Sequence, residues 1–397
     1  MPGLLSDSLS GGGVASAVSQ WVVRKMAAKK SVVVKGCKMN SIVAGIDLGD
    51  TESLTTVLSP TGDVVDRFSF PMNEEGYTYF ANRVPKQARV AFESTIMAYP
   101  ITRALRGYGY LDVTVAHPKT LAWIVRSKKK NDRVDSLKIA KLHMAGMLPE
   151  SHLLDRDAQT VRDLLVQRAK IGAEIGRLKN SVIAYLKREG IYGSLPKATD
   201  SFSLKRRLAI RSLRFNDDRD LVLGTMMDRL EFLERQCVPL EERVKENAAL
   251  SDDVKLLMTI RGVDFYLASL ISSFIGDVNR FPSDDHLASF FGVVPANRDS
   301  ADVKRRGKMT KDGSSIARWT LSVMVDTVTK HNQPIKEYYQ SVKKRTGSGK
   351  LAHVATMRKL ARMLYHMLKT RQHWRWENTL LTERKLARLG IVGGDVS

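Results

Sequence analysis

A short apolar run that ends in an acidic residue limits the possible folds more than any other feature of the chain. Residues 42–46 read Ile-Val-Ala-Gly-Ile, and Asp47 follows them. A run of this length is typical of a strand buried in a sheet. Four more segments have strand character, at residues 54–58, 64–70, 89–92 and 111–116. Turn-forming residues 59–63 lie between the first two of these, which predicts a hairpin. With a helix expected to begin near Asn131 or Asp132, residues 41–150 are predicted to form an α/β domain.

The middle of the chain has a helical repeat instead. Apolar residues recur at steps of three and four in two stretches, with Arg168 interrupting the first: Val161, Leu164, Ile171, Ile175, Leu178 and Val182, then Leu223, Met226, Leu230, Leu233, Cys237, Leu240 and Val244. This spacing is typical of coiled coils. Residues 190–200 separate the two helices, and Pro239 is expected to kink the second or to end it early. The pattern fits an antiparallel hairpin arm or a dimerising coiled coil, and a plain helical bundle equally well.

These patterns divide the chain into five parts. Residues 1–40 are expected to be a disordered basic leader, with Met1, Met26 or Met39 as the start. Residues 41–150 form the α/β domain and 151–250 the helical arm. Residues 251–370 form a second, mostly helical domain, and 371–397 a basic tail. Trp374 and Trp376 in that tail are expected to pack rather than to stack on bases.

The charge balance indicates the kind of partner. The 397 residues include 64 Lys and Arg against 42 Asp and Glu, which gives a net charge of +22. A field of that size attracts a polyanion, and nucleic acid is the usual one. The two cysteines, Cys37 and Cys237, exclude a disulfide framework and a cysteine-rich zinc site, and they fit a reducing cytoplasm. No apolar run approaches the roughly 18 residues of a membrane helix, so no membrane partner is expected.

Four carboxylates stand out by their positions. Asp47 and Glu93 each end a predicted strand, and Asp132 and Asp135 lie three residues apart at a predicted helix start. Carboxylates at such places can converge on one crevice at the edge of an α/β sheet. Hard oxygen ligands favour Mg²⁺ or Mn²⁺, and two such ions would stabilise attacking and leaving oxygens at phosphorus. Taken singly, each residue could instead be a cap or an ordinary solvated carboxylate.

A rival interpretation starts from the same first strand. Residues 45–51 resemble the first phosphate loop of the actin-like ATPases and sugar kinases, whose fold shares its sheet with ribonuclease H. Those proteins need a second Asp-Gly phosphate loop in a later domain, and the sequence has no convincing copy. The net charge of +22 also suits DNA better than a sugar.

The second domain supplies a hydroxyl group among cations. Residues 257–268 resemble half of a helix-hairpin-helix element, which would bind a DNA phosphate through backbone N–H groups, although a helix–turn–helix core connection is the alternative. Ser300 then lies in a non-helical stretch, and Ser314 and Ser315 compete with it as nucleophiles. Nearby cations are candidate phosphate ligands: Arg298, Lys304, Arg305, Arg306, Lys308 and Lys311.

Taken together, the chain resembles the DEDD transposases of insertion-sequence family 110, which include the Piv-type DNA invertases, over about residues 41–370. The resemblance rests on these motifs: Gly45-Ile46-Asp47, Phe92-Glu93-Ser94-Thr95, His117-Pro118-Lys119, residues 130–136, Gly292-Val293-Val294-Pro295, Ser300, Lys311-Asp312-Gly313 and residues 354–360. The chain departs from the family at Asn131 and Ser136, at the Ser300-Ala301 pair and at residues 96–98. None of these departures removes a catalytic group.

The resemblance implies a RuvC-like, ribonuclease H-type fold for the N-terminal domain, with a Mg²⁺ or Mn²⁺ site formed by Asp47, Glu93, Asp132 and Asp135. It implies that Ser300 becomes covalently joined to a DNA phosphate, and that Arg358 and Lys359 contact nucleic acid. Donor and target DNA, a non-coding bridge RNA and assembly as a tetramer, a dimer of dimers, are the implied partners. The implied location is the bacterial or archaeal cytoplasm, at the nucleoid.

We therefore predict an RNA-guided DNA recombinase, the transposase of an insertion sequence, with a serine–DNA intermediate. Three alternatives remain at this point. They are a metal-dependent Holliday-junction nuclease without a covalent intermediate, an actin-like ATP-binding protein, and an architectural nucleic-acid-binding protein.

Overall fold

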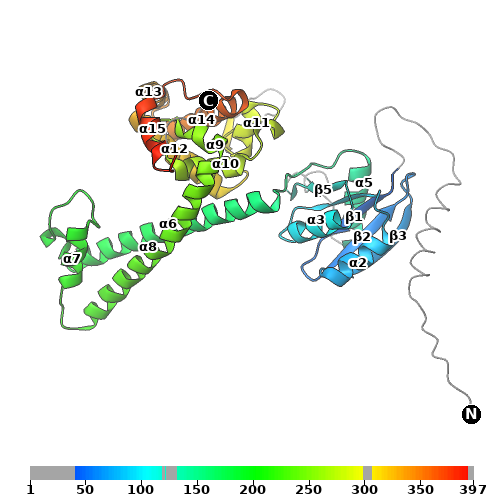
Figure 1. The fold of residues 1–397 in the computed structure, drawn as a ribbon, viewed down its shortest axis with the longest axis horizontal. Helices are drawn as coiled ribbons and strands as arrows, with labels where there is room; N and C mark the ends of the chain where they lie inside the picture. The colour runs from blue at the N-terminus through cyan, green and yellow to red at the C-terminus, as the bar shows by residue number, and fades with distance from the viewer. Residues whose placement is uncertain (1–40, 119–120, 122–131, 298–305, 392–397) are drawn as a thin grey trace, which may run out of the picture. The chain divides into compact units, whose positions relative to one another are not determined.

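A computed structural model describes residues 41–118, 121, 132–297 and 306–391. The chain separates into two compact units at the boundary between Leu153 and Leu154 (Figure 1). The first unit contains the sheet, and the second contains the long helices. The predicted leader at residues 1–40 lies outside the described residues.

The first unit is built on a five-stranded sheet in the order β3-β2-β1-β4-β5. Strands β1, β2 and β3 pair antiparallel, whereas β1, β4 and β5 pair parallel. The strands are β1 (Val43–Asp47), β2 (Glu52–Leu58), β3 (Val64–Pro71), β4 (Arg89–Glu93) and β5 (Val113–Ala116). All five predicted strands are present, and β2 and β3 form the predicted hairpin. The order and directions confirm the ribonuclease H-type fold.

Helices cover both faces of this sheet. Alternate residues of β1 point to opposite faces, so Ala44 and Ile46 join one apolar cluster while Val43 joins another. The first cluster includes α2 (Glu74–Arg83) and α3 (Ala98–Gly107), where Phe80 and Ile101 are fully buried. On the other face α5 (Asp132–Met144) packs its predicted apolar residues, Leu137, Ala140 and Met144, against β1 and β2.

Gly45 lets α5 lie very close to β1. A Cβ atom at Gly45 would fall 2.3 Å from the carbonyl oxygen of Ser136 and 2.5 Å from the amide nitrogen of Ala140. Real Cβ atoms do not approach backbone this closely, so only glycine fits. At the other end of the helix, Met144 Sδ lies 3.7 Å from the Cβ position of Gly62, in the β2–β3 turn. That turn adjoins the start of β1, where Val43 pairs with Leu58. The first turn of α5 is therefore at the Asp47 end of β1.

The second unit begins with the predicted hairpin arm. Helices α6 (Arg156–Arg188) and α8 (Asp218–Leu250) run antiparallel, because Lys179 bonds Glu234 at 3.1 Å while Glu189 bonds Arg219 at 3.4 Å. A 3-10 turn (Tyr192–Ser194) and α7 (Leu204–Ser212) connect them. Most of the predicted repeat residues form the interface of the two helices, whereas Val161, Leu164 and Val244 belong to the helical core that follows the arm. Arg168, which interrupts the repeat, bonds Glu241 at 3.0 Å and lies over the ring of Tyr266.

Pro239 does not end the second helix, so the expected early end is wrong. Helix α8 continues through Pro239 to Leu250. Proline removes one backbone hydrogen bond from a helix interior. Buried residues on both sides, Cys237 and Val244, hold the helix against its neighbours across that gap.

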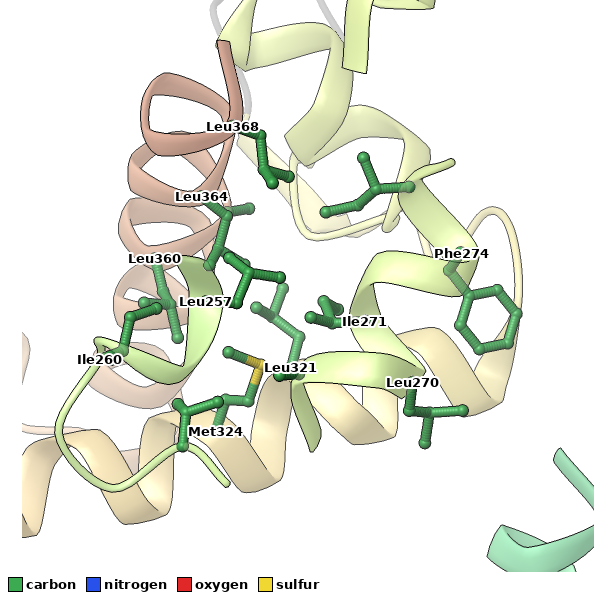
Figure 2. Packing of buried hydrophobic residues seen from close by; sticks show 14 of the residues in the cluster. Leu257, Ile260, Leu270, Ile271, Phe274, Leu321, Met324, Leu360, Leu364 and Leu368 are labelled. Atoms are coloured by element: carbon green, nitrogen blue, oxygen red, sulfur yellow. The ribbon is translucent and has the colours of Figure 1, made fainter. Parts of the chain in front are cut away.

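The rest of the second unit is a helical core with one small hairpin. Side chains from α9, α10, α12 and α14 meet at its centre, among them Leu257, Ile271, Leu321 and Leu364 (Figure 2). Its elements are α9 (Asp252–Met258), α10 (Phe265–Ile275), a 3-10 turn (Val278–Arg280), α11 (Asp284–Phe290), β6 (Pro295–Asn297), β7 (Arg306–Met309), α12 (Ser315–His331), α13 (Gln333–Thr346), α14 (Gly349–Thr370) and α15 (Thr379–Ala387). The mostly helical character is as predicted.

The C-terminal segment joins this core. Trp374 is only 3% exposed, and its ring nitrogen donates to Asn332 Oδ1 at 3.0 Å. Lys385 on α15 is buried and donates to the carbonyl oxygens of Ile260 and Val263. The packing role predicted for Trp374 is confirmed.

Candidate active site

Two of the four predicted carboxylates are at the ends of neighbouring parallel strands. In the parallel pair of β1 and β4, Ile46 lies beside Phe92, and the next residues are Asp47 and Glu93. Both are half-buried. The carboxyl ends of neighbouring parallel strands form a crevice at the sheet edge. The sheet therefore brings Asp47 and Glu93 to one place.

The other two carboxylates come from α5, whose first turn is at the same end of β1. Asp132 is the first residue of that helix, and its side chain lies outside the described part of the structure. Asp135 is on the next turn, is 26% exposed and receives a hydrogen bond from Lys138 Nζ at 3.4 Å. The backbone thus carries all four predicted acidic positions to the same end of the sheet.

The sequence prediction left out His117, which is at this edge too. Glu93 pairs with Ala116 at the end of β5, and His117 is the next residue. Its backbone N–H donates to the carbonyl oxygen of Pro149 at 2.7 Å, and its own carbonyl oxygen accepts the N–H of Leu121 at 2.9 Å, so the backbone of His117 is held on both sides. The signal was available, because His117 directly follows a predicted strand, as Asp47 and Glu93 do.

Ser136 explains one departure from the family pattern. Its hydroxyl is fully buried and hydrogen-bonds Thr56 Oγ1 on β2 at 2.8 Å. Arg67 Nε on β3 donates to the same Thr56 oxygen at 3.2 Å. A buried hydroxyl is tolerated when it has a partner, and this pair ties α5 to β2 near the carboxylates.

The second half of the predicted site is a hairpin whose base is closed by two glycines. A Cβ atom on Gly292 (φ +64°) would lie 2.3 Å from the carbonyl oxygen of Asp312, and one on Gly313 (φ +73°) 2.3 Å from that of Phe290. The Gly292–Pro295 and Lys311–Gly313 motifs therefore pack against each other. Strands β6 and β7 extend from this base and pair antiparallel.

Ser300 belongs to the segment that connects β6 to β7, and it lies outside the described residues. So do Arg298, Lys304 and Arg305. Arg306 and Lys308 are on β7, with only their backbone described. Lys311 is exposed at the hairpin base. The predicted basic stretch therefore coincides with the hairpin and its base.

The competing serines are placed differently. Ser314 Oγ accepts the N–H of Ala317 at 3.3 Å and caps α12, and Ser315 is the first residue of that helix. A serine that caps a helix has a structural task of its own. Ser314 has this task, whereas Ser315 is exposed and makes no cap hydrogen bond among the described residues.

The segment that resembles half of a helix-hairpin-helix element is a core connection. Gly262 (φ +94°) lies against α12, where an added Cβ would be 3.0 Å from the Thr327 carbonyl oxygen. Asp264 caps α10 and accepts the N–H of Phe265 at 2.8 Å. A carboxylate at the helix start repels a phosphate, so the alternative of a helix–turn–helix connection is correct here.

Comparison with known proteins identifies the family. A family model described as "Transposase IS116/IS110/IS902 family" matches residues 254–340. A second model, the DEDD transposase of IS110, matches residues 44–190. The chain belongs to the IS110 family of transposases. A protein of Sinorhizobium fredii (strain NBRC 101917 / NGR234), named "Putative transposase y4qE", is 26% identical over 235 residues. That match spans 58% of this chain and 56% of the relative's length.

Membership in the IS110 family removes the actin-like alternative and implies that the DEDD domain uses a divalent metal. The chemistry of the donor set fits a hard cation, because β1, β4 and α5 each carry carboxylate residues, whose oxygens are the ligands that Mg²⁺ prefers. Among side chains that the structure describes, no group of three His, Cys, Asp or Glu is close enough to hold a metal ion. The side chain of Asp132 is not in that comparison. No described helix is long and apolar enough to cross a membrane.

Proposed function

We propose that this IS110-family protein cleaves and rejoins DNA strands through a covalent serine–DNA intermediate. The observation that carries the proposal is the arrangement of two separate sets of groups. Four acidic positions are at one end of a ribonuclease H-type sheet, and the segment of the sequence that contains Ser300 connects β6 to β7, whose base the two glycine motifs close.

Ser300 acts as the nucleophile. Its Oγ attacks a DNA phosphorus and gives up its proton, and the phosphorus–oxygen bond to one sugar breaks. That sugar oxygen leaves as a hydroxyl after protonation. Rejoining reverses the step with the hydroxyl of another strand. The cations of the hairpin, including Lys311, hold the phosphate and stabilise the charge that develops on it.

The acidic residues are the ligands for a divalent ion. Asp47, Glu93, Asp132 and Asp135 would hold it through their carboxylate oxygens, and Mg²⁺ or Mn²⁺ would supply charge stabilisation and activation of oxygen nucleophiles. Asp47 and Glu93 are half-buried, so water screens their charges less than it would on an open surface.

The partners of this reaction are donor and target DNA, and a non-coding bridge RNA that pairs with both. Base pairing by the RNA would then choose the sequence, while the protein contacts backbone and shape. The acting form is a homotetramer, a dimer of dimers, in which the helical arm joins subunits. The net charge of +22 supports binding to nucleic acid as a class.

Strand exchange by purified variants tests the proposal. We expect Ser300→Ala and Asp47→Asn each to abolish exchange while DNA binding persists, because both remove chemistry rather than binding surface. Ser315→Ala, an exposed serine near the same hairpin, is the matched control and should exchange normally. Cleavage by Ser300→Ala at the normal rate would instead indicate a metal-dependent nuclease without a covalent intermediate.

A further inference from the structure

The second unit contains a large pocket beside the β6–β7 hairpin. It has a volume of about 1010 Å³ and lies among α11, α13, α14 and the two hairpin strands. This volume is at the upper end of the range for small-ligand sites. Its apolar lining includes Val293, Met309, Val342 and Met363. Pro295 and Met309 line it from the two hairpin strands themselves.

One side of this pocket is strongly basic. The charged residues that line it are Asp284 against Arg345, Arg358, Lys359 and Arg362, with His366 nearby. A binding site for an apolar peptide would not need four such cations. An apolar interior with a cationic rim matches a nucleotide, whose base is flat and largely apolar and whose phosphate is an anion.

Two aspartates of α11 form ion pairs with arginines at the rim of the pocket. Asp284 accepts from Arg362 Nε at 2.6 Å and lies 3.3 Å from His366 Nε2, and Asp285 accepts from Arg358 Nη2 at 2.9 Å. The two arginine side chains are 49% and 40% exposed. The Asp285–Arg358 pair is exposed on both sides, and such pairs contribute little stability, on the order of 0–1 kcal/mol. Asp284 is only 14% exposed and keeps its bond to Arg362 Nε, so a phosphate would bind the other guanidinium nitrogens of Arg362.

Arg358 also has an unused donor. Its Nε is shielded from solvent and has no hydrogen-bond acceptor among the described residues. A buried donor without an acceptor is unfavourable. A phosphate oxygen at the rim would supply the missing acceptor after a small rotation of the guanidinium. Tyr338 also lines the pocket, and Lys359 Nζ lies over one face of its ring, 4.1 Å from the ring centre, so a base would stack on the other face or on the ring edge.

We infer that this pocket holds one unstacked nucleotide of the DNA strand, with its base against Tyr338 and the apolar lining and its phosphate on Arg358 and Arg362. The inference rests on the proposed function for the choice of DNA. A base held beside the β6–β7 hairpin would fix the position of the DNA strand along the protein. It would thereby determine which phosphate is presented to the segment that connects β6 to β7. Taking a base out of a stack costs a few kcal/mol, which an aromatic and cationic pocket can offset.

Photo-cross-linking tests this inference directly. The probe is a single-stranded oligothymidine in which one base is 5-iodouracil, irradiated with the full-length protein and mapped by peptide mass spectrometry. We expect a cross-link on Tyr338. Ala355→Phe fills the pocket and should lower the yield at Tyr338 by roughly fivefold or more, as loss of base stacking implies. The matched control Ala249→Phe, half-buried on α8, should leave the yield unchanged.

A second variant covers the case in which Ala355→Phe does not fold. Leu351 is 57% exposed at the pocket, so Leu351→Trp can narrow it without disturbing the core. It should lower the yield as well. Normal cross-linking to Tyr338 in both variants would overturn the inference, as would a cross-link that forms only with the RNA form of the probe.

The same samples separate this inference from the proposed function. A Ser300 adduct on a cleavable DNA substrate, without any cross-link to Tyr338, would overturn the pocket inference alone. A cross-link to Tyr338 without a Ser300 adduct would overturn the serine mechanism and leave the pocket standing.

Discussion

The two units position their functional residues by different means. In the first unit the acidic residues follow strands and begin a helix, so the backbone register of the sheet fixes where they lie. In the second unit the serine and its cations depend on a hairpin whose base is closed by Gly292 and Gly313. The first arrangement also needs α5 to lie against β1, through the contact of Gly45 with Ser136, and the second needs Gly292 to lie against Asp312. Substitutions at Gly45 and at Gly292 should therefore each act on their own unit.

The largest effect is expected at Gly45. Gly45→Ala places a Cβ atom 2.3 Å from the carbonyl oxygen of Ser136, which is backbone and cannot rotate away. We expect the first unit to lose about 3 kcal/mol or more of unfolding free energy, measured by urea denaturation. The matched control is Gly176→Ala on α6, where the added Cβ meets open space. It should gain up to about 1 kcal/mol. Equal stabilities for the two variants would contradict the tight packing of α5 on β1.

Gly292→Ala tests the other unit. The residue has a φ of +64°, and its added Cβ would lie 2.3 Å from the Asp312 carbonyl oxygen. We expect a cost of about 3 kcal/mol and the loss of strand exchange, while the first unit keeps its stability. Gly347→Ala has nearly the same φ, +67°, with no atom within 4 Å of the new Cβ. Gly347→Ala therefore measures only the cost of placing a non-glycine residue at a positive φ, about 1 kcal/mol. This variant should retain strand exchange. Normal exchange by Gly292→Ala would mean that the hairpin base does not position the nucleophile.

His143 makes the first unit sensitive to acid. Burial, reinforced by the positive charge of Arg89, lowers the pKa of His143 from 6.5 to about 4. The unfolded chain therefore binds the proton more readily than the folded one. The stabilisation is complete above about pH 6.5 and is lost as pH falls toward 4, by roughly 3 kcal/mol in total. Unfolding titrations of wild type and His143→Gln at several pH values measure it, with the exposed His373→Gln as control. The same acid dependence in His143→Gln would rule out this residue as the cause.

A smaller effect is expected at Ser136. Ser136→Ala restores the family's usual residue and removes the hydrogen bond to Thr56, which keeps the one from Arg67. Because Thr56 retains a partner, we expect a loss of only about 1 kcal/mol, measured by urea denaturation. Ser181→Ala, an exposed serine on α6, is the control and should change stability by less. A loss above about 3 kcal/mol would show that the Ser136–Thr56 pair is a main support of α5.

Much of the first unit could be predicted from the sequence. Each strand is a short run with turn residues beside it, and alternation of two residues fixes which side chains face the core. The positions of Asp47 and Glu93 at strand ends follow directly. That α5 lies with its first turn at the same end does not follow, because it depends on the contact of Gly45 with Ser136 and Ala140.

Less of the second unit was predictable. The repeat of apolar residues predicts two long helices, since the pattern is local to each helix, but it left an antiparallel hairpin arm, a dimerising coiled coil and a plain bundle as alternatives. Pro239 suggested an early end because local propensity takes no account of the packing that holds α8 on both sides. The β6–β7 hairpin was not predicted, since both strands are short and their pairing depends on the distant contact of Gly292 with Asp312.

Identification of the residue that becomes joined to DNA tests the central claim most directly. The protein is incubated with a cleavable DNA substrate and divalent metal, denatured and digested, and the nucleotide-bearing peptide is sequenced by mass spectrometry. The proposed mechanism predicts a phosphonucleotide on Ser300, absent from Ser300→Ala and retained in Ser315→Ala. Attachment to Ser314, Ser315 or any other residue, or strand exchange without an attached peptide, would contradict it.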